Sequence, residues 1–189
     1  MIISSHKILE LNPTHHFIEN LAEREKNPEG VGFDLRLGEV YALEGDGFLG
    51  VEERKTPDIR KIADVRTDKS IVIKPGDFYL VKTMETISLP SEKIHIEDGW
   101  PPMLLMANIH PRSTLQRCGL YLRATKTDPG YTGELTFALT NLGPSTITLE
   151  LGARIANLVF HGVIGQLSRA YEGQWKGGRV STGAKETQN

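Results

Sequence analysis

Glycine and proline divide this chain into short segments, and that spacing is the strongest constraint on its fold. The sequence holds 19 glycines and 10 prolines. Several of the segments alternate apolar and polar residues, as residues 134–141 do, which is the period of a strand with one buried face. Turn signals at Pro75-Gly76, Pro129-Gly130 and Gly143-Pro144 separate such segments. Many short strands with turns between them predict an all-β fold, a sandwich or barrel. The expected strands are residues 35–43, 70–83, 120–124, 134–141, 146–151 and 154–161.

The helical signal is thin. Residues 17–26 predict one surface helix that ends before Asn27-Pro28. Residues 113–118 predict a single helical turn whose amide N–H groups could face an anion. Residues 52–69 mix acidic and basic side chains and predict a solvated loop or a hairpin. One or two short helices are therefore expected beside the strands.

Composition limits the class of protein. At 189 residues the chain is most simply one domain with a sizeable core. Its formal net charge of −2 provides no overall basic field for a long nucleic acid, so an anionic ligand must be met by a local cluster of positive charge. No apolar run of about 18 residues and no leader-like N-terminus are present. These features predict a cytoplasmic protein without a membrane partner.

Metal-ligating residues are sparse. The one cysteine, Cys118, excludes an intrachain disulfide and the paired cysteine ligands of zinc-dependent nucleobase deaminases. We interpret it as a small buried apolar residue. The six histidines show no metal-ligand spacing, so none is assigned to a metal.

A cluster of basic and hydroxyl side chains is the clearest functional signal. Arg112, Ser113, Thr114 and Arg117 fall within six residues. Guanidinium groups match phosphate oxygens in pairs, and hydroxyls fill the remaining positions. Asp128 follows on a Pro-Gly turn, where a carboxylate can orient or deprotonate a water, although Asp before Pro-Gly is also a common turn residue. The combination indicates a nucleotide-processing enzyme.

The polar, glycine-rich tail from Gly173 onward has two interpretations. Such composition is typical of a disordered terminus. Alternatively, its glycines permit a concave run of backbone donors, and Ser181 and Thr182 supply hydroxyls, as in a mobile arm that closes over phosphates. Composition by itself favours the disordered terminus.

Five segments, in order, resemble those of the trimeric dUTP diphosphatases and of the dCTP deaminases that share their fold. The resemblance extends from about Gly30 to Gly183. The motif with the closest match is Arg-Ser-Thr-Leu-Gln-Arg-Cys-Gly-Leu at residues 112–120, and it is followed by Asp-Pro-Gly-Tyr-Thr-Gly at residues 128–133. The five segments are residues 32–38, 85–90, 112–120, 128–133 and 152–160.

The resemblance implies a distorted β-barrel or jelly-roll-like domain that assembles as a homotrimer with active sites between subunits. It also implies that residues 1–172 form this domain and that residues 173–189 form a flexible arm closing over the triphosphate. The resemblance implies that the diphosphatase arm carries an aromatic residue in its glycine-rich run, where this chain has Arg179. Either Trp175 takes over stacking, or the arm works as it does in the deaminases. The candidate substrate contacts are Arg112, Ser113, Thr114, Arg117, Tyr131, Thr136, Asn157, Tyr171, Trp175, Lys176, Arg179 and Ser181.

One position separates the two reactions of this superfamily. The resemblance implies that deamination needs a glutamate ten residues after Asp128, where this chain has Ala138. Glu134 is the nearest carboxylate. It lies on the same strand face as Ala138 but four residues earlier, roughly 13 Å away at about 3.3 Å per residue. Tyr131 also matches the diphosphatases, whose tyrosine lies against the deoxyribose, although it could simply be an aromatic core residue. These residues favour hydrolysis.

The resulting hypothesis is hydrolysis of dUTP to dUMP and pyrophosphate. Asp128 activates a water, and Mg²⁺, held mainly by the triphosphate rather than by protein ligands, neutralises charge on the leaving group. Asn157 stands where diphosphatases carry a glutamine and is one methylene shorter. Asp34 is expected to pair with Arg112 or Arg36, and Arg154 is expected in an ion pair or an interface.

Two alternatives stay open. A dCTP deaminase, mono- or bifunctional, is favoured by Arg117, which is a feature of that branch. A catalytically inactive nucleotide-binding regulator of the same fold is compatible with Arg179 and the short Asn157. Either alternative would keep a pyrimidine deoxynucleoside triphosphate as the ligand.

Overall fold

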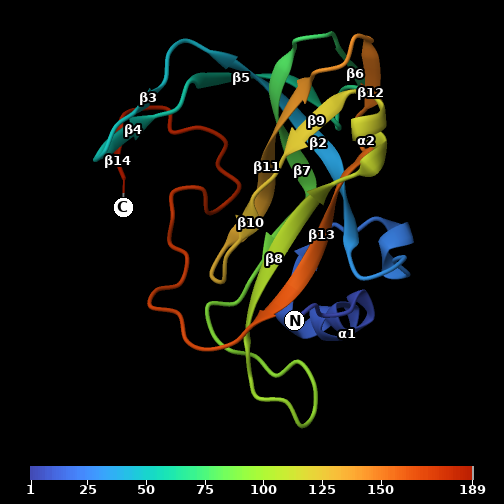
Figure 1. The fold of residues 1–189 in the computed structure, drawn as a ribbon, viewed down its shortest axis with the longest axis vertical. Helices are drawn as coiled ribbons and strands as arrows, with labels where there is room; N and C mark the ends of the chain where they lie inside the picture. Colours follow the sequence, from blue (N-terminus) through green and yellow to red (C-terminus); the bar gives the residue numbers. More distant parts are fainter. Residues whose placement is uncertain (189) are drawn as a thin grey trace.

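The computed structural model describes residues 1–188. Strands dominate it, with two α-helices and one 3₁₀ helix (Figure 1). The elements are α1 (Ser5–His15), β1 (Ile18–Glu19), η1 (Glu23–Lys26), β2 (Phe33–Glu44), β3 (Phe48–Leu49), β4 (Glu53–Lys55), β5 (Asp58–Asp64), β6 (Ser70–Ile73), β7 (Phe78–Ser88), β8 (Leu104–Pro111), α2 (Ser113–Arg117), β9 (Leu120–Arg123), β10 (Lys126–Thr127), β11 (Thr132–Asn141), β12 (Ile147–Glu150), β13 (Arg154–Val163) and β14 (Glu186–Thr187).

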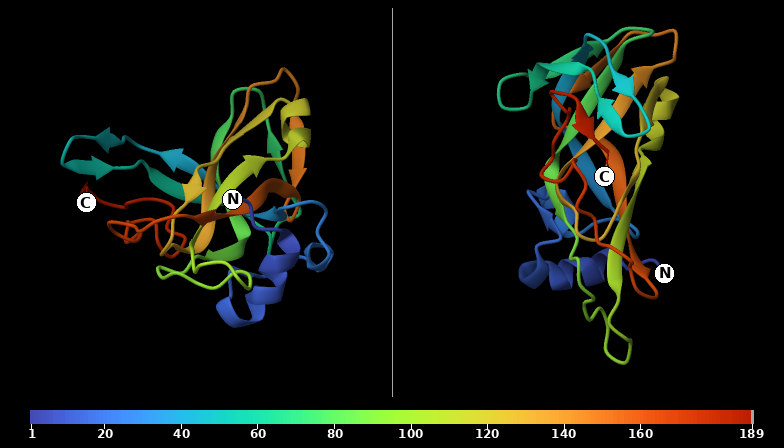
Figure 2. Two further views of the ribbon diagram at one scale, coloured as in Figure 1. Left: turned by 60° about the horizontal axis from the view of Figure 1, so that its bottom comes forward. Right: turned by 90° about the vertical axis from the view of Figure 1, so that its left-hand side faces the viewer.

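The main sheet has nine strands and curls into a distorted half-barrel (Figures 1 and 2). Its principal order is β10-β8-β13-β2-β7-β11-β9, with β1 added to β7 and β5 added to β2. The long strand β2 joins the two halves, because its first residues pair with β13 and its later residues pair with β7 and β5. Gly38 lies at this change of partner, where a Cβ would press against the carbonyl of Thr83. The all-β, barrel-like prediction is confirmed.

The core lies inside the curl. Phe160 on β13 packs with Phe17 and Phe33 at ring-centroid distances of 6.0 and 6.1 Å, and all three side chains are fully buried. Strand β11 alternates buried and half-buried residues along its length, as the sequence period predicted. Burying one face of each strand fixes the register, because a slip by one residue would expose the apolar set.

The helix predicted over residues 17–26 is wrong. The first helix is α1, which begins after Ser4, whose side chain accepts from the Lys7 amide, and ends at His16 in the left-handed region. Asn12 then bonds both backbone groups of Ile18, and Ile18 joins β7 as the short strand β1. Only Glu23–Lys26 is helical in the predicted interval, and it is a 3₁₀ turn. Tertiary pairing overrides a weak local helical preference here.

Most predicted strands are present, and the predicted turn over residues 113–118 is confirmed as α2. The interval 70–83 is two strands, β6 and β7, divided at Pro75-Gly76, where Gly76 has a φ of 86°. The prediction omitted β8 and treated residues 52–69 as a loop or hairpin. That interval contains β4 and β5, and β4 does belong to a hairpin with β3.

A three-stranded sheet stands apart from the half-barrel. It consists of β3, β4 and the C-terminal strand β14, and it projects from the body in both figures. No helix among residues 1–188 is long and apolar enough to cross a membrane.

Candidate functional site

Asp128 lies on a braced turn between β10 and β11. The Tyr131 amide donates to the Asp128 carbonyl, and the Gly130 amide donates to the carbonyl of Leu89. Gly130 has a φ of 95°, which glycine adopts without a Cβ penalty. The Asp128 carboxylate accepts from the Lys126 ammonium, two residues earlier. The turn therefore presents a half-exposed carboxylate in a defined direction.

A pocket of about 450 Å³ opens beside this carboxylate. Asp128 is its only acidic lining residue among those that the structure describes. Tyr131, Thr136 and Tyr171 also line it, so these sequence-predicted residues share one cavity with Asp128. The Thr136 hydroxyl is buried and has no hydrogen-bond partner. The full lining is Thr56, Leu80, Ile109, Thr125, Lys126, Thr127, Asp128, Tyr131, Leu135, Thr136, Phe137, Tyr171, Trp175, Arg179 and Val180.

Tyr131 forms part of the pocket wall. Its side chain is 8% exposed, and burial raises the pKa of its hydroxyl. That hydroxyl donates to the Glu134 carbonyl at 2.6 Å, while the ring lies 5.8 Å from that of Tyr171. A neutral aromatic ring fixed at one edge can offer its face to a sugar or a base.

The C-terminal arm, residues 173–188, covers this pocket. The Gly177 amide donates to the carbonyl of Thr132 at 2.6 Å, and a side chain at Gly133 would collide with the backbone of Gly178. Trp175 and Arg179 line the pocket, whereas Lys176 is exposed and lies outside the lining. Ser181 is half-buried and also outside the lining.

Arg112 and Asn157 lie elsewhere, around Asp34. The carboxylate of Asp34 is buried and accepts from Arg112, from Arg154 at 2.8 Å and from Asn157 at 3.0 Å. Burial raises the pKa of Asp34, but the hydrogen bonds from Asn157, Arg112 and Arg154 outweigh it and hold that pKa below its ordinary value. We call these four residues the Asp34 cluster. Arg112, Asn157 and Asp34 border a separate hollow of about 310 Å³.

The ion-pair predictions are largely confirmed. Asp34 pairs with Arg112, and Arg154 is an ion-pair residue. The alternative partner, Arg36, was wrong, because its side chain bonds the fully buried carboxylate of Glu85. Arg36 lies two residues beyond Asp34 on β2, where the strand is passing from one half of the sheet to the other.

The phosphate-binding motif and Asp128 do not meet within one chain. Ser113, Thr114 and Arg117 are exposed on α2 and do not line the Asp128 pocket. Strand register explains the separation. Thr127 pairs with Ala107, and Arg112 lies five residues beyond Ala107, or about 17 Å along the strand at about 3.3 Å per residue. Within a single chain, residues 112–117 and Asp128 therefore lie apart.

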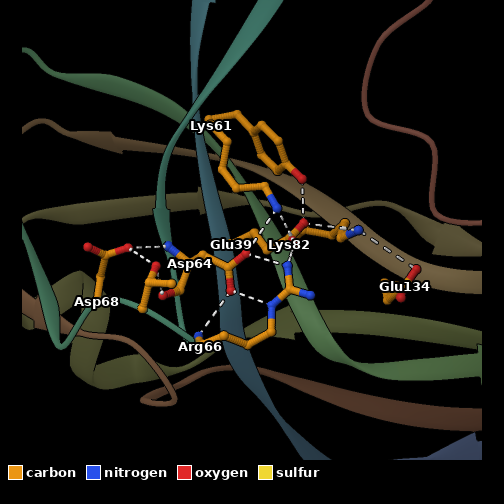
Figure 3. Close-up of polar contacts among 9 residues, drawn as sticks. Glu39, Lys61, Asp64, Arg66, Asp68, Lys82 and Glu134 are labelled. Atoms are coloured by element: carbon orange, nitrogen blue, oxygen red, sulfur yellow. Dashed lines mark hydrogen bonds and ion pairs between the residues drawn. The ribbon is translucent and has the colours of Figure 1, made fainter.

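A second group of charges lies on the face of the half-barrel (Figure 3). Glu39 accepts from Lys61 at 2.5 Å and pairs with Lys82 at 3.0 Å. Burial raises the pKa of Glu39, but hydrogen bonds from Lys61, Tyr41 and Lys82 outweigh it and hold that pKa below its ordinary value. We call the following residues the Glu39 cluster: Glu39, Lys61, Asp64, Arg66, Lys82 and Glu134.

Comparison with known proteins identifies the family. A model of the dCTP deaminase-like family matches residues 2–163. The chain belongs to that family. The motif resemblance had predicted this superfamily, and the prediction is confirmed.

Curated relatives of this family member carry both activities in their names. A probable deoxyuridine 5'-triphosphate nucleotidohydrolase of Aeropyrum pernix is 33% identical over 147 residues, covering 77% of this chain and 82% of the relative. A dCTP deaminase of Pyrobaculum calidifontis is 32% identical over 154 residues, covering 82% and 80%. A dUMP-forming dCTP deaminase of Dictyoglomus turgidum is 28% identical over 149 residues, covering 76% and 71%. These similarities support an enzyme of deoxynucleotide metabolism. They do not distinguish hydrolysis of dUTP from deamination of dCTP, which must be argued from the residues of the site.

A solved structure confirms the fold. The 2'-deoxycytidine 5'-triphosphate deaminase of Agrobacterium tumefaciens superposes with a TM-score of 0.60 at 19% identity and covers 84% of this chain. The match takes in 48% of that protein, so the present chain spans about half of its length.

Lys126 and Thr56 are among the pocket residues that the sequence did not predict. Lys126 lies two positions before Asp128, and this i, i+2 spacing could have revealed it. Thr56 reaches the pocket from the end of the β3–β4 hairpin, for which the local sequence gave no signal. Across the described residues, no three His, Cys, Asp or Glu side chains gather as a metal site.

Proposed function

We propose that this family member hydrolyses dUTP to dUMP and pyrophosphate. The observation that carries the proposal is the single carboxylate, Asp128, among the described lining residues of the pocket. Hydrolysis needs one group to take a proton from water, whereas deamination also needs a group that shuttles protons to the ring and the departing amine. Ala138, which stands where the deaminases need a glutamate, cannot move a proton. These residues support a diphosphatase reaction.

In the proposed reaction, Asp128 orients a water and accepts its proton. The water oxygen bonds to the α-phosphorus as the bond to the bridging oxygen breaks, and pyrophosphate carries away the electron pair. Lys126 holds the Asp128 carboxylate in place before substrate enters. Tyr131 and Thr136 supply an aromatic face and a free hydroxyl in the same cavity. Positioning and one base are sufficient for this chemistry.

The phosphate grip is proposed to come from a second copy of the chain. Arg112, Ser113, Thr114 and Arg117 lie on α2 or at its start, outside the Asp128 pocket. A homotrimer whose neighbouring subunit brings α2 to this pocket would complete the site. Arg112 is fixed by Asp34 in a defined orientation, which suits a two-pronged contact with phosphate.

Mg²⁺ fits this site as a companion of the substrate. Asp128 is the only lining carboxylate among the described residues, so the protein offers too few oxygens for a dedicated cage, and Mg²⁺ ordinarily takes substrate phosphates together with one or two carboxylates. When bound, the ion supplies charge neutralisation on the leaving pyrophosphate.

Product analysis tests the proposal. The protein is incubated with dUTP and separately with dCTP in Mg²⁺, and chromatography resolves the nucleotides. Asp128→Asn should lower kcat for dUTP by about 10²- to 10⁴-fold, while Asp98→Asn, at an exposed carboxylate of the loop before β8, should retain wild-type activity.

Two outcomes would contradict dUTP hydrolysis, and a third would contradict the role of Asp128. Uracil nucleotides formed from dCTP would indicate a deaminase. Tight nucleotide binding without product would indicate a regulator. Full activity of Asp128→Asn would remove the assigned base.

A further inference from the structure

The β3–β4 hairpin, residues 48–55, is the only part of the described chain that pairs with the C-terminal strand β14. Glu186 pairs with Arg54, and Thr187 pairs with Glu53, in antiparallel register. Figure 1 shows the C-terminal segment running back along this projecting hairpin, and Figure 2 shows the hairpin standing clear of the half-barrel. The end of the arm is thus held by strand addition to the edge of the hairpin.

A reciprocal pair of hydrogen bonds joins the arm to the hairpin's end. The Thr56 amide donates to the Thr182 hydroxyl at 3.0 Å, and the Thr182 amide donates to the Thr56 hydroxyl at 2.9 Å. Thr182 is 4% exposed. Further along, Lys185 pairs with Glu53 and lies 4.7 Å from the centroid of the Phe48 ring. The contact combines backbone, hydroxyl and charged interactions over a short length of chain.

The same hairpin contacts the aromatic residue of the arm. The Arg54 guanidinium lies 5.4 Å from the centroid of the Trp175 ring, within the range of a cation–π contact. Trp175 and Thr56 both line the Asp128 pocket. Between Trp175 and Thr182 the arm has two glycines at positive φ, Gly177 and Gly178. Such a segment loses much conformational entropy when ordered, so its position depends on the bond from the Gly177 amide to the Thr132 carbonyl and on the anchors at its two ends.

We infer that the β3–β4 hairpin is a docking platform for the C-terminal arm and that Arg54 and Thr56 are positioning residues for Trp175. They hold the indole as one wall of the Asp128 pocket. The Arg179 guanidinium bonds the Thr182 carbonyl and the Glu186 carboxylate within the arm. The effect of this placement on dUTP kinetics depends on the proposed function, whereas the docking of the arm does not.

Arm docking is tested first without any nucleotide. The chain has two tryptophans, so Trp100→Phe makes Trp175 the sole reporter of acrylamide quenching. In this background Thr56→Val and Thr182→Val each remove one hydroxyl of the reciprocal pair. Each variant should make Trp175 more accessible to the quencher. Each should also speed trypsin cleavage after Lys176 and Arg179 by about fivefold, the effect of one neutral hydrogen bond on a local opening equilibrium.

Matched variants separate docking from general loss of structure. Thr56→Ser keeps the accepting hydroxyl and should behave as wild type. Thr148→Val, on the exposed side of β12, makes the same chemical change away from the arm and should leave quenching and cleavage unchanged. Equal quenching and cleavage for Thr56→Val, Thr56→Ser and Thr148→Val would overturn the inference.

Nucleotide kinetics then test the placement of Trp175. Arg54→Met should raise KM for dUTP several-fold with a smaller change in kcat, because it loosens the wall of the pocket and leaves Asp128 in place. An unchanged KM together with increased quenching of Trp175 would overturn the role of Trp175 as a wall of the substrate pocket. Failure of dUTP hydrolysis in the wild type would refute the proposed function, while the ligand-free quenching and proteolysis results would still decide the docking platform.

Discussion

Two clusters in this protein, the Glu39 cluster and the Asp34 cluster, place cationic or amide donors around an acidic side chain. They differ in whether those donors are shared with other carboxylates. In the Glu39 cluster, donors are shared between carboxylates. Lys61 contacts both Glu39 and Asp64, and Lys82 lies between Glu39 and Glu134 (Figure 3). Every cation in the cluster is therefore occupied by protein carboxylates. Such a group can hold strands β2, β5, β7 and β11 in register, and its three cations are matched by three carboxylates.

The Asp34 cluster is unbalanced, whereas the Glu39 cluster matches three carboxylates with three cations. Two guanidiniums, those of Arg112 and Arg154, face one buried carboxylate, and the side chain of Arg112 remains 32% exposed beside a hollow. A guanidinium has five N–H donors, so pairing with Asp34 leaves others for a phosphate. Glu25 and Glu29 also line this hollow, so a phosphate contact would come from the exposed part of the Arg112 guanidinium and not from an overall excess of positive charge.

The largest expected effect follows from removing one guanidinium from each cluster. Arg112→Met should lower kcat/KM for dUTP by about 100-fold or more, because a charged contact to phosphate is lost. Arg66→Met removes a guanidinium that bonds Asp64 and Glu39 in the other cluster and should leave kcat/KM unchanged. Steady-state hydrolysis of dUTP by the two variants measures the difference.

The same two variants could also contradict the distinction between the Asp34 cluster and the Glu39 cluster. Equal loss of activity in Arg112→Met and Arg66→Met would mean that both clusters act through the stability of the sheet. A thermal melt of each variant is the control, because activity must be measured where both proteins are folded.

A smaller effect is expected when the central carboxylate of each cluster, Asp34 or Glu39, is replaced by its amide. Asp34→Asn should cost about 1–3 kcal/mol of unfolding free energy, less than breaking a fully buried pair because its arginines can regain water. It should also lower kcat/KM about tenfold, since Arg112 loses the group that orients it. Glu39→Gln should destabilise by about 1–2 kcal/mol without changing kcat/KM. Urea unfolding and dUTP kinetics on both variants give the two quantities; a loss of kcat/KM in Glu39→Gln alone would reverse the assignment.

The sequence predicted the barrel and its clearest strands because burial on one face imposes a period that can be counted. The Ser4 cap that begins α1 is a local signal that the prediction overlooked. The strand β1 could not be placed, since the pairing of Ile18 and Glu19 with β7 is a long-range choice that no local pattern records. The helix predicted over residues 17–26 failed for this reason.

The sequence predicted the residue types of the site but not how they are arranged in space. The residue types around Asp128 are a motif, and Tyr131, Thr136, Tyr171, Trp175 and Arg179 do line its pocket. The distance from Asp128 to Arg112 depends on the register of β10 against β8, which the sequence does not show. The sequence indicated a loop or hairpin near Thr56 but not its place at the pocket, because the contacts of Thr56 are with residues more than a hundred positions away.

The smallest expected effect is a difference in acid sensitivity between the clusters. The pKa of Glu39 lies below its ordinary value of 4.5 in the folded protein, and that of Asp34 lies below 3.8. Each ionised carboxylate therefore stabilises the fold above its ordinary pKa, and the contribution is lost as the pH falls toward the folded-state pKa. On acidification from pH 7, the stability gap between wild type and Glu39→Gln should begin to narrow near pH 4.5, and the gap to Asp34→Asn only near pH 3.8. Urea unfolding at several pH values measures both gaps. A gap for Asp34→Asn that narrows well above pH 4 would show that its guanidinium partners do not hold the carboxylate ionised, and the unbalanced charge assigned to that cluster would be wrong.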